Sequence, residues 1–106
     1  IRDSPEYCAS KGGVLAYTKN VALRVAKYGA TCNSISAGGV ITELNAHILE
    51  NKSLWDQVMA ETLIPKWATV EEMAEWTYFL AVVNKSMTAQ DVLIDNGEIA
   101  KANFVW

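Results

Sequence analysis

The chain has 106 residues, enough for one domain but not two, because most domains contain roughly 100–200 residues. Its 51% hydrophobic and 20% charged residues exclude a disordered tail, which would be polar and strongly charged. A formal net charge of -3 excludes the basic surface that binds nucleic acid or anionic lipid. No apolar run approaches the roughly 18–20 residues that span a bilayer. We therefore expect neither nucleic acid nor membrane as a partner.

The cysteines and tryptophans restrict the environment of the protein. Cys8 and Cys32 do not have the Cys-x-x-Cys spacing of metal or redox sites, and two cysteines are too few for a disulfide scaffold. They indicate reduced thiols in a cytoplasmic protein. The four Trp need an interior or a partner surface to cover them.

The first expected element is one long helix from Pro5 to Tyr28, because apolar residues recur there at helical spacing. Pro5 suits the first turn, and Gly29 is suited to a left-handed cap after the last one. Small residues on adjoining turns lower helix propensity and predict a closely packed neighbour. They are Ala9, Gly12, Gly13 and Ala16.

A strand and a flap are expected next. Residues 30–35 follow the helix stop and favour a buried strand, which Ser36-Ala-Gly-Gly39 ends. Two weak helical patterns between Glu43 and Met59, separated by residues 50–53, predict two short helices in a mobile flap.

The last elements are a helix and a strand. Thr69 and Glu72 form a capping box that opens a helix reaching Val83, and residues 91–95 predict a strand ending in a turn at Asn96-Gly97. The order of the elements implies that the two strands pair in parallel. Two parallel strands do not form a stable sheet alone, so we expect part of the fold to lie outside this chain.

Tyr7 and Lys11 are the strongest candidates for chemistry. Four residues apart on a helix, they stand about 40° apart around its axis and share one face. An ammonium beside a phenol stabilises the phenolate, which a tyrosine needs to transfer protons near neutral pH. The spacing alone also fits two unrelated residues on a surface helix, and Gly38-Gly39 alone also fits a plain connecting turn.

Four segments in order give a more specific indication. They are Tyr7-Cys-Ala-Ser-Lys11-Gly-Gly-Val, Asn33-Ser-Ile-Ser-Ala-Gly-Gly-Val-Ile-Thr42, Lys66-Trp-Ala-Thr-Val-Glu-Glu-Met-Ala74 and Asp95-Asn-Gly97. Together they resemble the Tyr-x-x-x-Lys helix, the Asn-x-Ile-x-Pro-Gly-x-x-x-Thr stretch, the Arg-x-Gly-x-Pro-Glu-Glu-Ile-Ala helix start and the Asp-Gly-Gly turn of the short-chain dehydrogenase/reductase family.

This resemblance implies an α/β fold, the C-terminal portion of a Rossmann-like doubly wound parallel sheet. Residues 1–106 would be the C-terminal segment of a single NAD(P)-binding domain whose phosphate-binding half is absent. The implied function is an NAD(P)-dependent oxidoreductase that interconverts an alcohol and a carbonyl, with a small-molecule substrate. Expected partners are further copies in a homo-oligomer or the missing N-terminal part. The alternative is a non-catalytic folding or oligomerisation fragment.

The resemblance also implies roles for individual residues. Tyr7 would be the general acid in carbonyl reduction and the general base in alcohol oxidation. Lys11 would assist Tyr7 and hold the ribose hydroxyls on the nicotinamide side of NAD or NADP. The nicotinamide end would meet the loop after the first strand, whose expected binding residues are Ala37, Gly38, Val40 and Thr42.

Some positions depart from the family pattern. Ala37 and Val70 each replace a usual Pro, and the Gly-rich turn, the Asn and the catalytic Ser of the family cannot be located before Tyr7. No metal site is expected, because the lone histidine, His47, favours a surface or substrate-lining role. Trp55 and Met59 share a helix face and are candidates to border a substrate pocket.

Overall fold

A computed structural model describes residues 5–99. This part forms two compact units: residues 5–35 with 78–92, and residues 36–77 with 93–99. Both strands run from one unit into the other. Each unit is considered by itself below.

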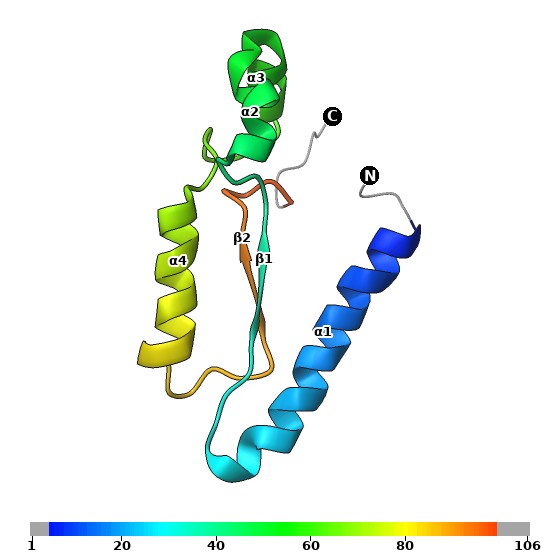
Figure 1. Ribbon diagram of the computed structural model, residues 1–106, viewed down its shortest axis with the longest axis vertical. Coiled ribbons are helices and arrows are strands. Elements are labelled where there is room, and N and C mark those ends of the chain that lie inside the picture. Colours follow the sequence, from blue (N-terminus) through cyan, green and yellow to red (C-terminus); the bar gives the residue numbers. More distant parts are fainter. Residues whose placement is uncertain (1–4, 100–106) are drawn as a thin grey trace, which may run out of the picture. The chain divides into compact units, whose positions relative to one another are not determined.

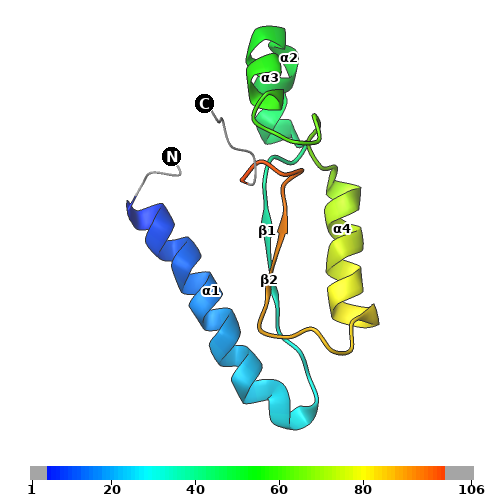
Figure 2. The ribbon, with the colours of Figure 1, turned by 180° about the vertical axis from the view of Figure 1, so that it is seen from behind.

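Helix α1, Pro5–Val25, is the main element of the first unit and is a continuous coil in Figures 1 and 2. A 3-10 turn, Ala26–Tyr28, extends it, and Gly29 ends it at φ 72° with its N–H donating to Ala26 O. The predicted helix and its glycine cap are therefore confirmed. The predicted close neighbour of its small residues is not found among residues 5–99, where a methyl group at Gly12 or Gly13 would meet nothing within 4 Å.

Strands β1, Ser34–Ala37, and β2, Asp91–Ile94, form the two-stranded sheet. Ser34 N donates to Gln90 O and Gly38 N donates to Ile94 O, both at 3.0 Å. The residue numbers of the two partners rise together, so the strands are parallel, as the order of elements predicts.

The predicted position of the first strand is wrong by several residues, because β1 begins at Ser34 rather than Ala30 and ends at Ala37 rather than Ile35. It is half-buried rather than buried, and Ala37 is exposed. Just before β1, backbone and side-chain bonds are mixed: Cys32 O accepts from Ala89 N at 2.8 Å, whereas Asn33 bonds through its side chain. Asn33 Nδ2 donates to Met87 O at 3.0 Å, and Asn33 Oδ1 accepts from Gln90 N at 3.1 Å. The regular ladder therefore begins at Ser34, after the side-chain bonds of Asn33.

The flap in the second unit consists of a 3-10 turn, Glu43–Asn45, followed by α2, Ala46–Glu50, and α3, Lys52–Met59. The two predicted short helices are confirmed, but the break between them is only Asn51. Its Oδ1 accepts from Leu54 N at 3.1 Å and caps α3. This cap lets α3 start one residue after α2 ends.

Helix α4, Val70–Tyr78, continues as a π-helical turn, Phe79–Val83, so the predicted helical segment is confirmed to its last residue. Its start is the predicted capping box. Thr69 Oγ1 accepts from Glu72 N at 3.1 Å, and the Glu72 carboxylate accepts from Thr69 N at 3.2 Å.

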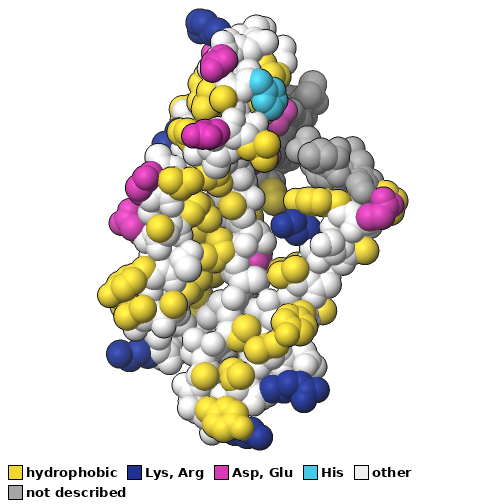
Figure 3. Space-filling view, in the orientation of Figure 1, with side chains coloured by type: hydrophobic (Ala, Val, Ile, Leu, Met, Phe, Trp, Pro, Cys, Tyr) yellow, Lys and Arg dark blue, Asp and Glu magenta, His cyan; other side chains and the backbone are white. Residues whose placement is uncertain are grey.

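Few apolar side chains are buried. The buried hydrophobic residues among those described are Ala22, Trp67, Ala68 and Leu80. Large hydrophobic residues are exposed in both units, as the yellow side chains in Figure 3 illustrate. Among the described residues no helix combines the length and the apolarity that crossing a membrane would require.

Candidate active site

Tyr7 and Lys11 lie in the first turns of α1, which carries both side chains on one face. Lys11 Nζ is 5.4 Å from the centroid of the Tyr7 ring, a cation–π distance. The Tyr7 side chain is 47% exposed, and Lys11 is exposed as well. The helix thus presents a phenol and an ammonium together at its surface.

The loop Gly38–Thr42 in the second unit follows β1 and is fixed by backbone hydrogen bonds. Val40 and Ala68 form an isolated parallel bridge. Within it, Ile41 N donates to Ala68 O at 2.9 Å, and Ala68 N donates to Gly39 O at 3.3 Å. The residues before α4 therefore hold this loop along its length.

Gly38 and Gly39 are required by packing inside the chain. A methyl group on Gly38 would lie 2.7 Å from Asp95 Cβ and 2.9 Å from Asp95 Cα. A methyl group on Gly39 would overlap ring atoms of Trp67. The resemblance implies a binding role for Gly38, which stays a prediction; the structure shows that the sites a Cβ would fill on both glycines already have neighbours from the same chain.

The turn after β2 supports the same loop. Asp95 is buried, and its carboxylate accepts from Gly97 N and Ile99 N, each at 2.9 Å. Asn96 O accepts from the backbone N–H groups of Leu63 and Ile64, each at 3.0 Å. This turn therefore joins Gly38 to the segment that follows α3.

Val40 and Thr42 carry polar groups of the loop whose hydrogen bonds within the described residues are few. Within the described residues, the Val40 N–H donates to no acceptor and the Thr42 hydroxyl makes no capping bond. Val40 O accepts from Asn45 Nδ2 at 3.0 Å, which leaves one of its two lone pairs. A donor, an acceptor and a hydroxyl within three residues match the groups of a carboxamide.

The structure brings the predicted residues together in two groups. Tyr7 and Lys11 belong to the first unit, whereas Gly38, Val40 and Thr42 share one loop of the second. Ala37 is the exposed last residue of β1. Sequence reasoning missed three supporting residues whose partners lie elsewhere in the chain: Asn45, Trp67 and Asp95.

Other candidates have plainer surroundings. His47 is exposed on α2, and the described residues contain no group of three His, Cys, Asp or Glu side chains able to hold a metal. Trp55 packs edge to face on Trp67, and its expected place with Met59 beside a substrate pocket stays a prediction.

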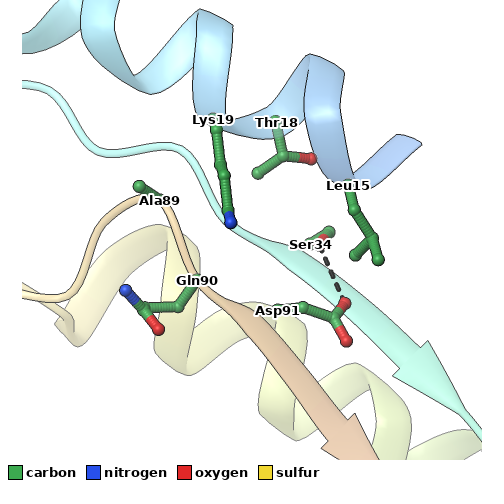
Figure 4. Close-up of a pocket in the computed structure, with 7 residues that line it drawn as sticks. All are labelled: Leu15, Thr18, Lys19, Ser34, Ala89, Gln90 and Asp91. Carbon is green, nitrogen blue, oxygen red and sulfur yellow. Dashed lines mark hydrogen bonds between the residues drawn. The ribbon is translucent and has the colours of Figure 1, made fainter. Parts of the chain in front are cut away.

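A cavity of about 320 Å³ lies in the first unit, between α1 and the start of the two strands (Figure 4). Ser34 Oγ donates to Asp91 Oδ1 across its floor at 2.8 Å. None of the predicted site residues lines it. Its lining residues are Leu15, Thr18, Lys19, Ser34, Ala89, Gln90 and Asp91.

Comparison with known proteins places this geometry in context. The family model described as enoyl-(acyl carrier protein) reductase matches residues 1–98. D-beta-hydroxybutyrate dehydrogenase of Rhizobium meliloti (strain 1021) is 33% identical, over 90% of this chain and 41% of its own length. 2-(R)-hydroxypropyl-CoM dehydrogenase of Xanthobacter autotrophicus is 36% identical, over 71% of this chain and 30% of its own length. The chain thus spans less than half of these relatives.

Solved structures of dehydrogenases are also similar to this chain over part of their length. A short chain dehydrogenase family protein from Francisella tularensis superposes with a TM-score of 0.79 at 29% identity, covering 95% of this chain and 46% of that one. A 4-hydroxyisoleucine dehydrogenase mutant, solved with NADH and succinate, gives 0.81 at 28% identity, covering 92% and 40%. The α/β fold is that of the Rossmann-type dehydrogenases, and the chain belongs to the short-chain dehydrogenase/reductase family.

Proposed function

We propose that residues 1–106 are the C-terminal segment of a single NAD(P)-binding domain, in an oxidoreductase that interconverts a small-molecule alcohol and a carbonyl. The family and the dehydrogenase and reductase names of the relatives support the reaction class. This chain covers 40% of the 4-hydroxyisoleucine dehydrogenase structure, which supports its assignment as a segment of a longer domain. A cytoplasmic homo-oligomer is the form we propose for the intact protein.

The observation that carries the proposal is the pairing of Tyr7 with Lys11, 5.4 Å from ring centroid to Nζ, in the first turns of α1. In this proposal the Tyr7 hydroxyl donates a proton to the carbonyl oxygen during reduction and accepts it during oxidation. Lys11 stabilises negative charge on the phenol oxygen and binds ribose hydroxyls.

The second unit is proposed to hold the nicotinamide end of NAD or NADP. A bound nicotinamide supplies or accepts the hydride. The residues present fit such a group, because backbone hydrogen bonds hold the loop while, within residues 5–99, the Val40 N–H donates to no acceptor and the Thr42 hydroxyl makes no capping bond. Related structures solved with NADH or with NADP and tartrate support this choice of cofactor. Gly38 and Ala37 shape the backbone beside these groups.

Tyr7→Phe in the intact enzyme tests the proposal, because it deletes the proton-transferring hydroxyl and keeps the ring beside Lys11. Turnover should fall by about 10²–10⁴, the usual contribution of general acid–base catalysis, while the Kd for the cofactor stays nearly unchanged. Tyr17→Phe is the matched control, since Tyr17 is an exposed tyrosine of the same helix. Full turnover by Tyr7→Phe would refute the assigned role.

The second candidate is a non-catalytic folding or oligomerisation segment. The exposed apolar side chains favour it, among them Leu23 at 78% and Leu44 at 85% exposure. Intact mass and cofactor binding of the purified natural protein separate the candidates. The enzyme is expected to bind NAD or NADP and to have a mass about twice that of this chain or more.

A further inference from the structure

Trp67 is the largest side chain in the buried core of the second unit, and it contacts two functional segments. It is only 8% exposed. Its ring meets that of Trp55 edge to face, with centroids 5.3 Å apart and an interplanar angle of 77°. Trp55 belongs to α3, so one face of Trp67 is in contact with the flap.

Trp67 also contacts the proposed nicotinamide loop. Its indole lies so close to Gly39 that a methyl group there would overlap ring atoms Cε2 and Nε1. The neighbouring Ala68 exchanges backbone hydrogen bonds with both sides of Val40. Residues 67 and 68 therefore fix the loop by side chain and backbone at once.

The indole N–H shows which property of Trp67 matters. Nε1 is buried and has no hydrogen-bond acceptor within the part of the chain that the structure describes. An unpaired buried donor is unfavourable, so hydrogen bonding does not explain a tryptophan at this position. What the site uses is the size and shape of the ring between Gly39 and Trp55.

We propose that Trp67 is a positioning residue that sets the loop Gly38–Thr42 for the cofactor and links its position to helix α3 through Trp55. This inference rests on the proposed function, since it assigns the loop to the nicotinamide. It predicts that loss of the Trp55 contact weakens cofactor binding while leaving the chemical step intact.

The first experiment is a mutant cycle in the intact protein, with Gly39→Ala, Trp67→Leu and the double variant. The Kd for NADH or NADPH is measured by the fluorescence of the reduced nicotinamide. Gly39→Ala should weaken binding more than tenfold, because the added methyl displaces the ring or the loop. In the Trp67→Leu background, which has a smaller side chain at position 67, Gly39→Ala should raise the Kd much less. Equal losses in both backgrounds would overturn the proposal.

The second experiment removes the flap contact instead, because Trp67 variants risk failing to fold. Trp55→Ala should raise the Kd for the cofactor about two- to tenfold, the effect expected for one aromatic pair. Turnover at saturating cofactor should remain, whereas a merely structural defect would reduce the active fraction and turnover instead. Trp55→Phe, which keeps an aromatic edge, should restore the wild-type Kd.

Trp76→Ala is the matched control, because Trp76 is a 44% exposed tryptophan on α4. It should leave the Kd unchanged. Wild-type protein that binds neither NAD nor NADP would overturn the proposed function and the inference together. Wild-type binding combined with an unchanged Kd for Trp55→Ala would overturn the inference alone.

Discussion

At the scale of single residues, the glycines of the second unit show how the site depends on packing. Gly38 lies against Asp95 and Gly39 against Trp67, so each excludes a side chain for a reason within the chain. The sequence identified this loop through its motif and gave Gly38 a binding role, but it gave no sign of these packing contacts. Contacts between residues 28 or more positions apart have no local signature, and only the folded chain reveals them.

Gly97→Ala should destabilise the protein by more than the backbone effect alone. Gly97 has a φ of 83°, and a methyl group there would lie 2.7 Å from Leu63. Gly29→Ala is the control, because Gly29 also has a positive φ, 72°, but nothing within 4 Å of an added methyl. Gly29→Ala should lower the free energy of unfolding by about 1 kcal/mol. Equal losses of unfolding free energy in urea titrations would show that Leu63 moves aside freely.

Lys11→Ala should reduce both turnover and cofactor affinity in the intact enzyme, because we assign Lys11 to the phenol and to the ribose. The 5.4 Å distance from Lys11 Nζ to the Tyr7 ring supports the first of these roles, and the resemblance to the family implies the second. Lys19→Ala, on the same helix, is the control and should leave the Tyr7-dependent reaction rate unchanged. Single-turnover rates and equilibrium titration measure the two effects separately. A loss confined to turnover would remove the ribose role.

At the scale of elements, local signals predicted helices well and the first strand less well. Gly29 ends α1 and Thr69 caps α4 through bonds between residues that are neighbours in sequence. The start of β1 depends instead on Asn33 bonding Met87 and Gln90, residues 54 and 57 positions away. Nothing near residue 33 records those partners, so the predicted start fell at the preceding helix stop.

The stability of the start of α4 should depend on pH through the ionisation of Glu72. The pKa of the Glu72 carboxyl lies below its ordinary value of 4.5. The main cause is the hydrogen bond from the Lys66 ammonium, and the second is the hydrogen bond from the Thr69 backbone N–H. A lowered folded-state pKa means that the stabilisation is complete above the unfolded pKa and is lost as the pH falls through the folded one. The loss therefore lies at pH values below 4.5.

Glu72→Gln measures this effect. The difference in unfolding free energy between wild type and Glu72→Gln should shrink as the pH falls from about 6 to about 3. Lys66→Met should remove the larger part of the same dependence. Because both side chains are over two-fifths exposed, added salt should weaken the effect as well. A difference that stays constant with pH would show that the capping box does not favour the carboxylate.

At the scale of the whole molecule, the sequence predicted the α/β class and the family through four motifs, because each motif is short and continuous. It grouped the candidate residues correctly along the chain: Tyr7 with Lys11 on one helix face, and Gly38, Val40 and Thr42 in one loop. What it could not supply is the support of that loop by Trp67, Asn45 and Asp95. Each of these acts through a contact made only after the second unit folds.

The 106 residues expressed alone should not behave as a stable monomer. Large hydrophobic side chains are exposed on α1, α4 and the flap, whereas the buried hydrophobic residues among residues 5–99 are Ala22, Trp67, Ala68 and Leu80. Burial contributes roughly 25 cal/mol per Å² of apolar area, so such a small core offsets little of the chain entropy lost on folding. A two-stranded parallel sheet also leaves strand edges open to pairing. Light scattering at micromolar concentration should detect self-association, and nicotinamide titration should detect no binding of NAD or NADP. A monomer of 11.7 kDa that unfolds cooperatively and binds either cofactor would contradict both expectations.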